Sequence, residues 1–248
     1  PTNIIEAKGD AFRKEILGIL NAVLKTERIS LTERRPAVAA VSAVQKRNAS
    51  AETRFKNKIV ALACSTGGPK ALQSVIPYLP ANLDAPMVLV QHMPAGFTNS
   101  MANRLDEISK IHVKEAENGE ILKKGTVYIA PGGKHMEVKK CPDGSHKIVY
   151  NDMPPIGGLK PCANITYDSL RTCGYDQVVC VVLTGMGADG TNGILELSKV
   201  KPIYTIAQDA QTCVVYGMPK AIAETGLVNE VVPLTEVANS ITKNVGVN

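Results

Sequence analysis

The sequence predicts an α/β protein with a doubly wound, mostly parallel open sheet of the Rossmann-like kind and an antiparallel hairpin addition. Three observations support this prediction. Short apolar runs of strand length alternate with segments of helical periodicity over most of the chain. The run at 177–184 is apolar almost throughout, as is typical of a strand buried on both faces. The runs at 135–140 and 146–151 instead flank Asp143-Gly144, which is a signal for a tight hairpin turn.

The first 57 residues are expected to lie outside this sheet. Residues 10–24 carry apolar side chains at helical spacing and predict an amphipathic helix. Residues 32–57 are rich in Ala, Ser, Thr, Asn and charge, include Pro36, and show no period, which is typical of a linker. We therefore expect an N-terminal helix and interdomain linker over 1–57, and one folded domain over 58–248.

The elements of the folded domain follow in a regular order. A buried strand at 58–64 ends in a turn of small residues and leads into a helix at 70–79. A strand at 86–91 and a helix ending near Leu105 repeat that order. The further expected elements are short strands at 111–116 and 125–131, the hairpin, a helix at 165–172, a strand at 177–184, a helix at 192–200, a strand at 202–208, and helices near 218–225 and 235–243.

Composition excludes several classes of protein. Hydrophobic residues make up 44% and charged residues 21%, which is ordinary for a globular domain. No apolar run approaches the roughly 20 residues that span a bilayer, and the start shows no signal-peptide pattern, so membrane insertion is not expected. The net charge of +5 comes largely from the first 58 residues and is interpreted as a solvated tail. With three Phe and no Trp, a stacking platform for nucleic acid is not expected.

The six cysteines show no metal-ligand spacing and no repeated framework. Cys64, Cys180 and Cys213 lie in or beside apolar runs and are expected to be small core residues. This usage favours a reducing compartment, the cytoplasm. No metal and no organic cofactor are expected.

Three polar residues each follow the carboxyl end of an expected strand. Ser65 follows 58–64, His92 follows 86–91, and Asp189 follows 177–184 after a few glycine-rich residues. The carboxyl ends of parallel strands share one edge of a sheet, where ligands bind. A serine nucleophile, a histidine base and an orienting carboxylate are the groups that acyl transfer requires. The pattern therefore predicts a catalytic triad.

Glycines accompany these residues. Gly67 and Gly68 allow a tight turn after Ser65 that points backbone N–H groups toward one spot, at the start of a helix. Such donors stabilise a developing oxyanion. Gly185 and Gly187 allow the Asp189 loop to lie close to the site.

Each member of the triad also has a structural interpretation. Ser65 is in a position to cap the following helix, His92 to be a satisfied core or loop histidine, and Asp189 to cap a turn. Cys64 is a rival nucleophile, although it ends an apolar strand. His135 also follows an expected strand end and is the main rival for the base. Two other histidines, His112 and His146, fall on polar strands and are expected at the surface.

One motif predicts a different function. Gly185, Gly187 and Gly190 form G-x-G-x-x-G between a strand and a helix, the context of a dinucleotide-binding fingerprint. Asp209 lies about 20 residues further on, where that fingerprint has its acidic residue. Only about 58 residues follow Gly190, and Asp189 would place a carboxylate against the pyrophosphate. An oxidoreductase is therefore kept as an alternative.

Five segments resemble the catalytic domain of the chemotaxis receptor methylesterases, the CheB family. They occur in the family's order over roughly residues 58–243. The segments are ACSTGGPKAL (63–72), VLVQHMPAGFT (88–98), EAENGEILKKGTVYIAPGGKHMEV (115–138), VVLTGMGADGTNG (181–193) and TIAQDAQTCVVYGMPKAI (205–222).

The resemblance implies hydrolysis of glutamyl methyl esters on chemoreceptors, with release of methanol, and deamidation of certain receptor glutamines. It implies Ser65 as nucleophile, His92 as base and Asp189 as carboxylate, and it places Thr66 and Met186 beside the site. A receiver domain, expected to be absent from this chain, would precede residues 1–57, and 58–248 would be the methylesterase domain.

Two further features concern the substrate side of the site. Met93, Met186 and Phe97 are candidate walls for the substrate side chain. Cys162-Ala163 stands where the family usually has a Pro-Ser-x-Asp-like stretch. A non-catalytic module that only docks on receptors is a further alternative.

Overall fold

The computed structural model describes residues 55–248, so the predicted helix at 10–24 and most of the predicted linker lie outside the described residues. Seven parallel strands form one sheet. They are β1 (Lys58–Cys64), β2 (Met87–Gln91), β3 (His112–Glu115), β4 (Thr126–Ile129), β7 (Gln177–Val182), β8 (Ile203–Gln208) and β9 (Glu230–Val232). Their order across the sheet is β3-β4-β2-β1-β7-β8-β9.

Strand β1 lies at the centre of this sheet because both of its faces are apolar. Every residue of β1 is buried, and its side chains alternate between two hydrophobic cores. Val60 and Leu62 belong to one core, whereas Ile59 and Ala61 belong to the other. A strand of this kind loses its packing if either face is opened to water, which is why parallel sheets are covered on both sides.

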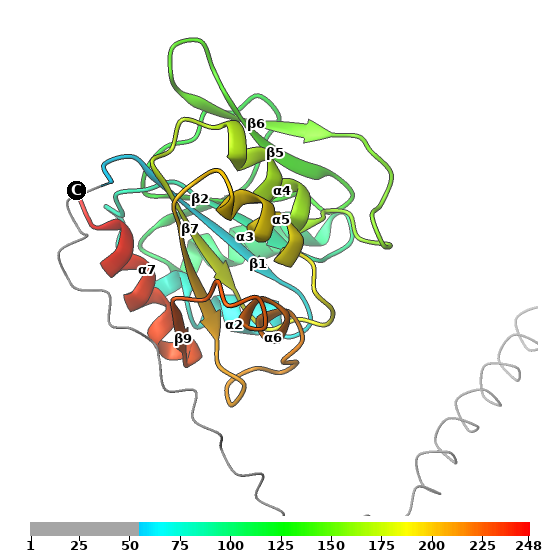
Figure 1. Cartoon of the computed structure of the whole chain (residues 1–248). Helices are drawn as coiled ribbons and strands as arrows, with labels where there is room; N and C mark the ends of the chain where they lie inside the picture. Colours follow the sequence, from blue (N-terminus) through cyan, green and yellow to red (C-terminus); the bar gives the residue numbers. More distant parts are fainter. Residues whose placement is uncertain (1–54) are drawn as a thin grey trace, which may run out of the picture. The chain divides into compact units, whose positions relative to one another are not determined.

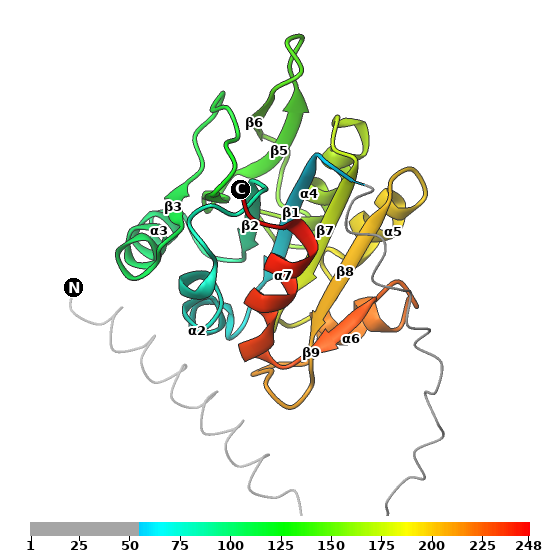
Figure 2. The ribbon, with the colours of Figure 1, turned by 90° about the vertical axis from the view of Figure 1, so that its left-hand side faces the viewer.

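Helices cover both faces of the sheet (Figures 1 and 2). Helices α2 (Gly68–Gln73), α3 (Phe97–Ile108) and α7 (Val237–Val245) contribute buried side chains to the core of Val60. The opposite core receives α4 (Ala163–Ser169), α5 (Thr191–Ser198) and α6 (Met218–Ala223). Short 3-10 turns complete the chain: η1 (Ile76–Tyr78), η2 (Leu170–Thr172) and η3 (Leu234–Glu236). The predicted doubly wound α/β class is confirmed.

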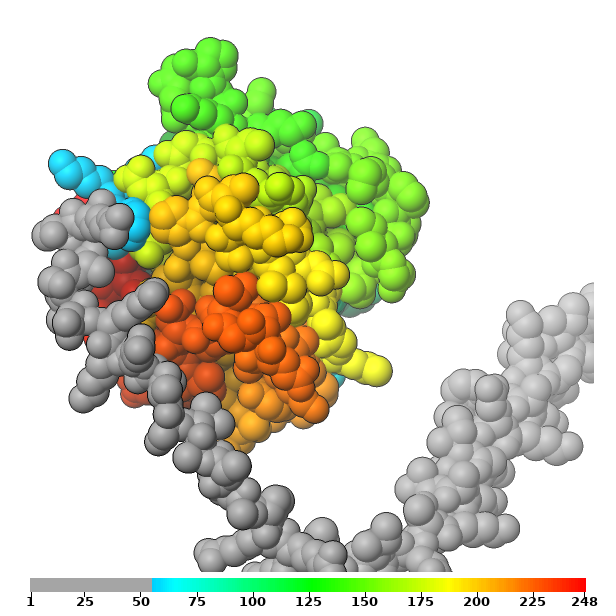
Figure 3. All heavy atoms as spheres, viewed as in Figure 1, coloured from blue at the N-terminus to red at the C-terminus, as the bar shows by residue number. Residues whose placement is uncertain are grey.

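The predicted hairpin is also confirmed. Strands β5 (His135–Lys140) and β6 (His146–Asn151) pair antiparallel as a separate two-stranded sheet. Gly144 adopts a left-handed φ of 87° in the connecting turn, a conformation that favours glycine. Met136 and Ile148 bury the inner face of the hairpin in the core that α4 and α5 share, and its tip projects from the domain (Figure 3).

Two elements differ from the sequence prediction. The helix expected at 70–79 is divided into α2 and η1, since Pro77 has no N–H for a continuous helical ladder. Strand β9 was not predicted, because three residues at a sheet edge are too short to show a period of two. Within residues 55–248, no helix is long and apolar enough to cross a membrane.

The loops after three adjacent strands define the edge of interest. Strands β2, β1 and β7 are neighbours, and all three run in the same direction. Their carboxyl ends are followed by His92, Ser65 and the loop that carries Asp189. The sheet therefore brings together the three loops that the sequence singled out.

Candidate active site

Ser65 occupies a tight turn between β1 and α2. Its backbone N–H donates to the carbonyl of Thr184 (3.0 Å), and its own carbonyl accepts from Gly68 N (2.8 Å). Gly67 has a φ of 83°, and a Cβ at this position would lie 2.6 Å from Cβ of Val214. Only glycine fits there. The turn leaves Ser65 partly exposed at the edge of the sheet.

Ser65 does not cap the helix that follows it. The N-cap of α2 is Gly67, and no side chain caps this helix end. The first alternative to a nucleophilic role for Ser65 is therefore wrong.

His92 lies on the neighbouring loop, after β2. Its backbone N–H donates to the carbonyl of Cys64 (3.2 Å), which ties the two loops together directly beside Ser65. Its ring nitrogen Nε2 is 2.7 Å from Oδ2 of Asp189, and both side chains are largely buried. Within residues 55–248, no hydrogen bond joins the Ser65 hydroxyl to His92. Catalytic hydrogen bonds are often long before substrate binds, so this geometry is compatible with a nucleophile–base pair.

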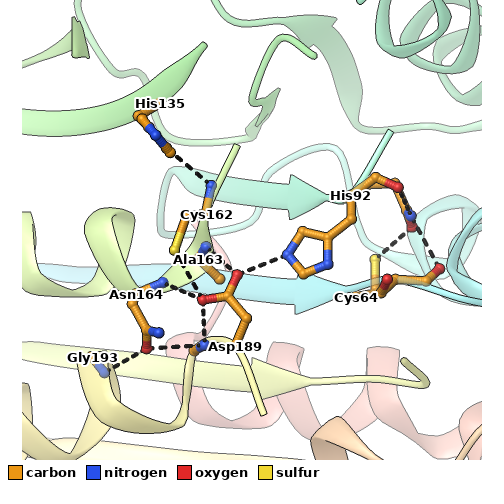
Figure 4. Close-up of polar contacts among 11 residues, drawn as sticks. Cys64, His92, His135, Cys162, Ala163, Asn164, Asp189 and Gly193 are labelled. Atoms are coloured by element: carbon orange, nitrogen blue, oxygen red, sulfur yellow. Dashed lines mark hydrogen bonds and ion pairs between the residues drawn. The ribbon is translucent and has the colours of Figure 1, made fainter. Parts of the chain in front are cut away.

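Asp189 is held entirely by hydrogen-bond donors. It lies in the loop between β7 and α5, beside His92 (Figure 4), and is 8% exposed. The donors are His92 Nε2 (2.7 Å) and Ala163 N (2.6 Å) on Oδ2, and Cys162 Sγ (3.1 Å), Asn164 N (3.0 Å) and Gly190 N (2.9 Å) on Oδ1. The three backbone donors belong to the first turn of α4 and the residue preceding α5, where helix ends carry unsatisfied N–H groups.

These contacts determine the charge of the carboxylate. Burial by itself raises the pKa of Asp189, because it penalises the charged form. The hydrogen bonds from His92, Ala163, Cys162 and Asn164 outweigh burial, so the pKa of Asp189 lies below its ordinary value. The side chain is therefore an anion at neutral pH and fixes a proton on Nε2 of His92.

His135 is the rival for the base, and both of its ring nitrogens are hydrogen-bonded to backbone groups. It is completely buried; its Nε2 donates to the carbonyl of Pro154 (3.2 Å), and its Nδ1 accepts from Cys162 N (3.2 Å). Both nitrogens are thus engaged in holding the chain just before α4. The geometry favours a structural role for His135.

The two other histidines differ from each other. His112 is exposed, as predicted, and pairs with Asp106 at 2.9 Å. The prediction of a surface position for His146 is wrong: it is 5% exposed, accepts from Gly174 N (2.9 Å) and stacks on Tyr175. Its strand is polar on one face only, and the other face packs against the domain.

The remaining predicted residues have mixed outcomes. Thr66 and Met186 are exposed beside the turns of Ser65 and Asp189, and Met93 is partly exposed. Gly68 is not a free oxyanion donor, because its N–H is bonded to the Ser65 carbonyl. Thr66 and Gly67 lie in the turn directly after Ser65.

The cysteine predictions hold for two of three residues. Cys64 and Cys180 are fully buried, and burial raises the pKa of each thiol far above its ordinary value. Cys64 is thus not an activated nucleophile. Cys213 is only half-buried, so its assignment to the core was wrong.

Four residues shape the site in ways that the sequence did not indicate, although Cys162 and Ala163 had been noted as a departure from the family pattern. Cys162, Ala163 and Asn164 all bond to Asp189, and Gln91 bonds to the carbonyls of Ser65 (3.0 Å) and His92 (3.1 Å). Backbone donors cannot be recognised from the side-chain pattern. Gln91 could have been recognised, since it is a polar residue at the end of an apolar strand, directly before His92.

The glycine motif of the dinucleotide alternative serves another purpose here. A Cβ on Gly185 would lie 2.3 Å from Sδ of Met218 and 2.9 Å from Cβ of Ser65, so this glycine permits close packing beside Ser65. The carboxylate of Asp189 accepts the N–H of Gly190, at the position where a pyrophosphate would be bound. This arrangement disfavours a dinucleotide site.

Comparison with known proteins gives consistent results. Residues 60–241 match the family model described as CheB methylesterase. A protein-glutamate methylesterase/protein-glutamine glutaminase of Symbiobacterium thermophilum is 42% identical over 228 residues, covering 92% of this chain and 60% of the relative. The protein of the same name from Bacillus subtilis is 46% identical over 185 residues, covering 75% of this chain and 52% of the relative.

A solved structure agrees with the fold. The crystal structure of the Thermotoga maritima CheB methylesterase catalytic domain aligns with a TM-score of 0.71 and 42% identity, covering 75% of this chain and 97% of that one. The chain spans between about half and two thirds of the length of the curated relatives it matches. With a family model that covers most of the folded domain and a relative aligned over 92% of the chain, this protein belongs to the CheB methylesterase family.

Proposed function

We propose that this protein is a protein-glutamate methylesterase that hydrolyses glutamyl methyl esters on chemoreceptors and also deamidates receptor glutamines. The observation that carries the proposal is the 2.7 Å bond between His92 and a buried, fully hydrogen-bonded Asp189, on the loop next to Ser65. Family membership favours the same reaction, since its curated relatives carry both activities in their names.

The proposed first step is acylation of Ser65. The Ser65 hydroxyl attacks the γ-carbonyl carbon of the ester, and its proton passes to His92. Because Nε2 bonds to Asp189, Nδ1 is the nitrogen that accepts this proton. His92 then protonates the departing methoxide, which leaves as methanol, and a glutamyl–serine ester remains.

Deacylation reverses the roles. Water attacks the glutamyl–serine ester while His92 takes its proton, and the Ser65 oxygen leaves with that proton to release glutamate. A glutamine substrate follows the same route with ammonia as the first leaving group. We propose that the turn at Thr66 and Gly67 supplies oxyanion donors, since the N–H of Gly68 is already bonded.

The substrate reaches Ser65 from an apolar rim. Met186 is 76% exposed, Phe97 60% and Val214 64%, and each lies in or just after a loop at the carboxyl edge of the sheet. We propose that Met186 and Phe97, with the partly exposed Met93, line the approach of one receptor side chain. The partner is then a methylated helix of a methyl-accepting chemotaxis protein.

The proposed organisation extends to the rest of the chain. Residues 58–248 would form the methylesterase domain, and a receiver domain would precede residues 1–57 in the full-length protein. A chemoreceptor substrate implies a cytoplasmic enzyme. No nucleic acid and no membrane insertion form part of this proposal.

Methanol release from methylated chemoreceptor membranes tests the proposal. The parent protein should release methanol, and Ser65→Ala should release none, because nucleophile and base act as one unit. Equal release by both proteins would contradict Ser65 as nucleophile. Receptor binding by both proteins without release by either would favour the non-catalytic docking module.

A further inference from the structure

Gln91 joins the two loops that carry the nucleophile and the base. It is the last residue of β2 and is 1% exposed. Its amide nitrogen donates to the backbone carbonyl of Ser65 (3.0 Å) and to that of His92 (3.1 Å). Its amide oxygen accepts from the thiol of Cys64 (3.1 Å). Both N–H groups and the oxygen of this amide are therefore used inside the protein.

Gly68 creates the space for this amide. A Cβ at position 68 would lie 1.9 Å from Oε1 and 2.9 Å from Cδ of Gln91. Gly68 is the first residue of α2 and does not have a positive φ, so no backbone conformation demands glycine there. The demand comes from the amide of Gln91, which lies against the Ser65 turn.

The register of the sheet explains why one side chain reaches both loops. Gln91 pairs with Cys64 on the parallel strand β1, so the next residues along the two strands, His92 and Ser65, are also neighbours. Backbone pairing ends here, apart from the bond from His92 N to the carbonyl of Cys64. The amide of Gln91 adds two bonds beyond the end of the ladder, one to each loop.

We propose that Gln91 is a positioning residue that holds the Ser65 turn and the His92 loop at a fixed separation, and that Gly68 is required because it leaves room for the Gln91 amide. This inference rests on the proposed function of Ser65 and His92. Gln91 touches neither reacting side chain; it acts through the backbone of both.

The consequence is kinetic. Attack by Ser65 requires His92 within hydrogen-bond distance, and a displacement of about 1 Å reduces the rate by about 100-fold. In Gln91→Met, a side chain of similar length fills the space but offers no hydrogen bonds. Two partly buried carbonyls then lose a donor, and the loops are free to separate.

The test is the rate at which a fluorophosphonate labels Ser65 in the full chain, followed by intact mass and peptide mapping. This probe requires an activated serine but no chemoreceptor. We expect Gln91→Met to lower the maximal labelling rate by about 100-fold while the probe concentration at half-maximal rate changes little. Val113→Ala, a buried change in the edge strand β3, is the control for lost packing, and its labelling rate should equal that of the parent.

A second variant, at Gly68, tests the contact between position 68 and the Gln91 amide. Gly68→Ala should also slow labelling, since the new methyl group collides with the Gln91 amide. In a Gln91→Ala background the colliding amide atoms are gone and only the 3.1 Å contact with Cys64 Sγ remains, so Gly68→Ala should slow labelling less there than in the parent. This cycle remains informative if Gln91→Met folds poorly.

The outcomes separate this inference from the proposed function. Parental labelling with equally fast labelling of Gln91→Met overturns the role of Gln91 and leaves Ser65 as nucleophile. Absence of labelling at Ser65 in the parent overturns the nucleophile and the role of Gln91 with it. Slow labelling in Gln91→Met and normal labelling in Val113→Ala support the inference.

Discussion

Replacing Asp189 with asparagine should disrupt the site more than the small change in shape suggests. Every group that contacts the carboxylate is a donor: two on Oδ2 and three on Oδ1. An amide has one oxygen and one NH2 group. In either orientation of the asparagine side chain, the NH2 group therefore faces the donors that bonded one of the two carboxylate oxygens. The less costly orientation keeps the oxygen on the Oδ1 side and turns the NH2 group toward His92 and Ala163.

Two losses follow from that orientation. The N–H of Ala163 then faces another N–H, and its charge-assisted bond is lost. The amide donates to Nε2 of His92, so the imidazole proton moves to Nδ1, the nitrogen that should accept the proton of Ser65. Hydrogen bonds to a charged group contribute about 1.5–3 kcal/mol each. Losing the bond from Ala163 predicts a decrease of about 1.5–3 kcal/mol in the free energy of unfolding.

The wrong tautomer predicts a loss of roughly 10⁴-fold in kcat, the size seen when the triad carboxylate of a serine protease becomes an amide. Urea unfolding measures the stability loss, and hydrolysis of a small activated ester measures kcat. A kcat within tenfold of the parent in folded Asp189→Asn protein would refute the assignment of Asp189 as the orienting carboxylate. A loss of kcat together with parental stability would refute the hydrogen-bond argument.

Three further predictions concern the same network. His135→Ala should be less stable, because Pro154 and Cys162 lose a partner, yet it should retain more ester hydrolysis than His92→Ala; the opposite ranking would exchange their roles. Cys162→Ser should keep a donor to Asp189 and stay near the parental rate, whereas Cys162→Ala should be slower by about tenfold, or about 1.4 kcal/mol; equal rates for the two variants would remove the thiol from the network. Because the pKa of Asp189 is lowered by folding, its ionisation contributes stability that is fully present above the ordinary value of about 3.9 and is lost as pH falls through the lower folded value. The difference in unfolding free energy between the parent and Asp189→Asn should therefore shrink below about pH 4 in acid-unfolding titrations, and a constant difference down to pH 2 would contradict an ionic origin.

Much of the architecture was accessible from the sequence because its signals are local. The runs of β1, β2, β7 and β8 are mostly apolar, and the helices between them carry apolar side chains toward a core. Alternation of strands and helices requires parallel crossovers, which place all carboxyl ends at one edge. Ser65, His92 and Asp189 could therefore be assigned to one edge from the sequence.

The environment of each side chain was decided by tertiary structure. Apart from the family resemblance, the local pattern does not distinguish His135, with both nitrogens bonded to backbone, from His92, with one nitrogen on a carboxylate. Backbone N–H groups are the same at every residue except proline, so the pattern of side chains cannot reveal which of them converge on Asp189. Only the packing of α4 and α5 against the sheet brings their first turns to the carboxylate.

The sequence by itself determined which residues end the central strands and which residue types are available there for acyl transfer. Tertiary structure alone decided which donors keep the Asp189 carboxylate charged and which amide joins the loops of Ser65 and His92. The physical reason is range: hydrophobic periodicity and turn chemistry act over a few residues, whereas the bonds to Asp189 from Cys162 and from His92 span 27 and 97 residues of chain.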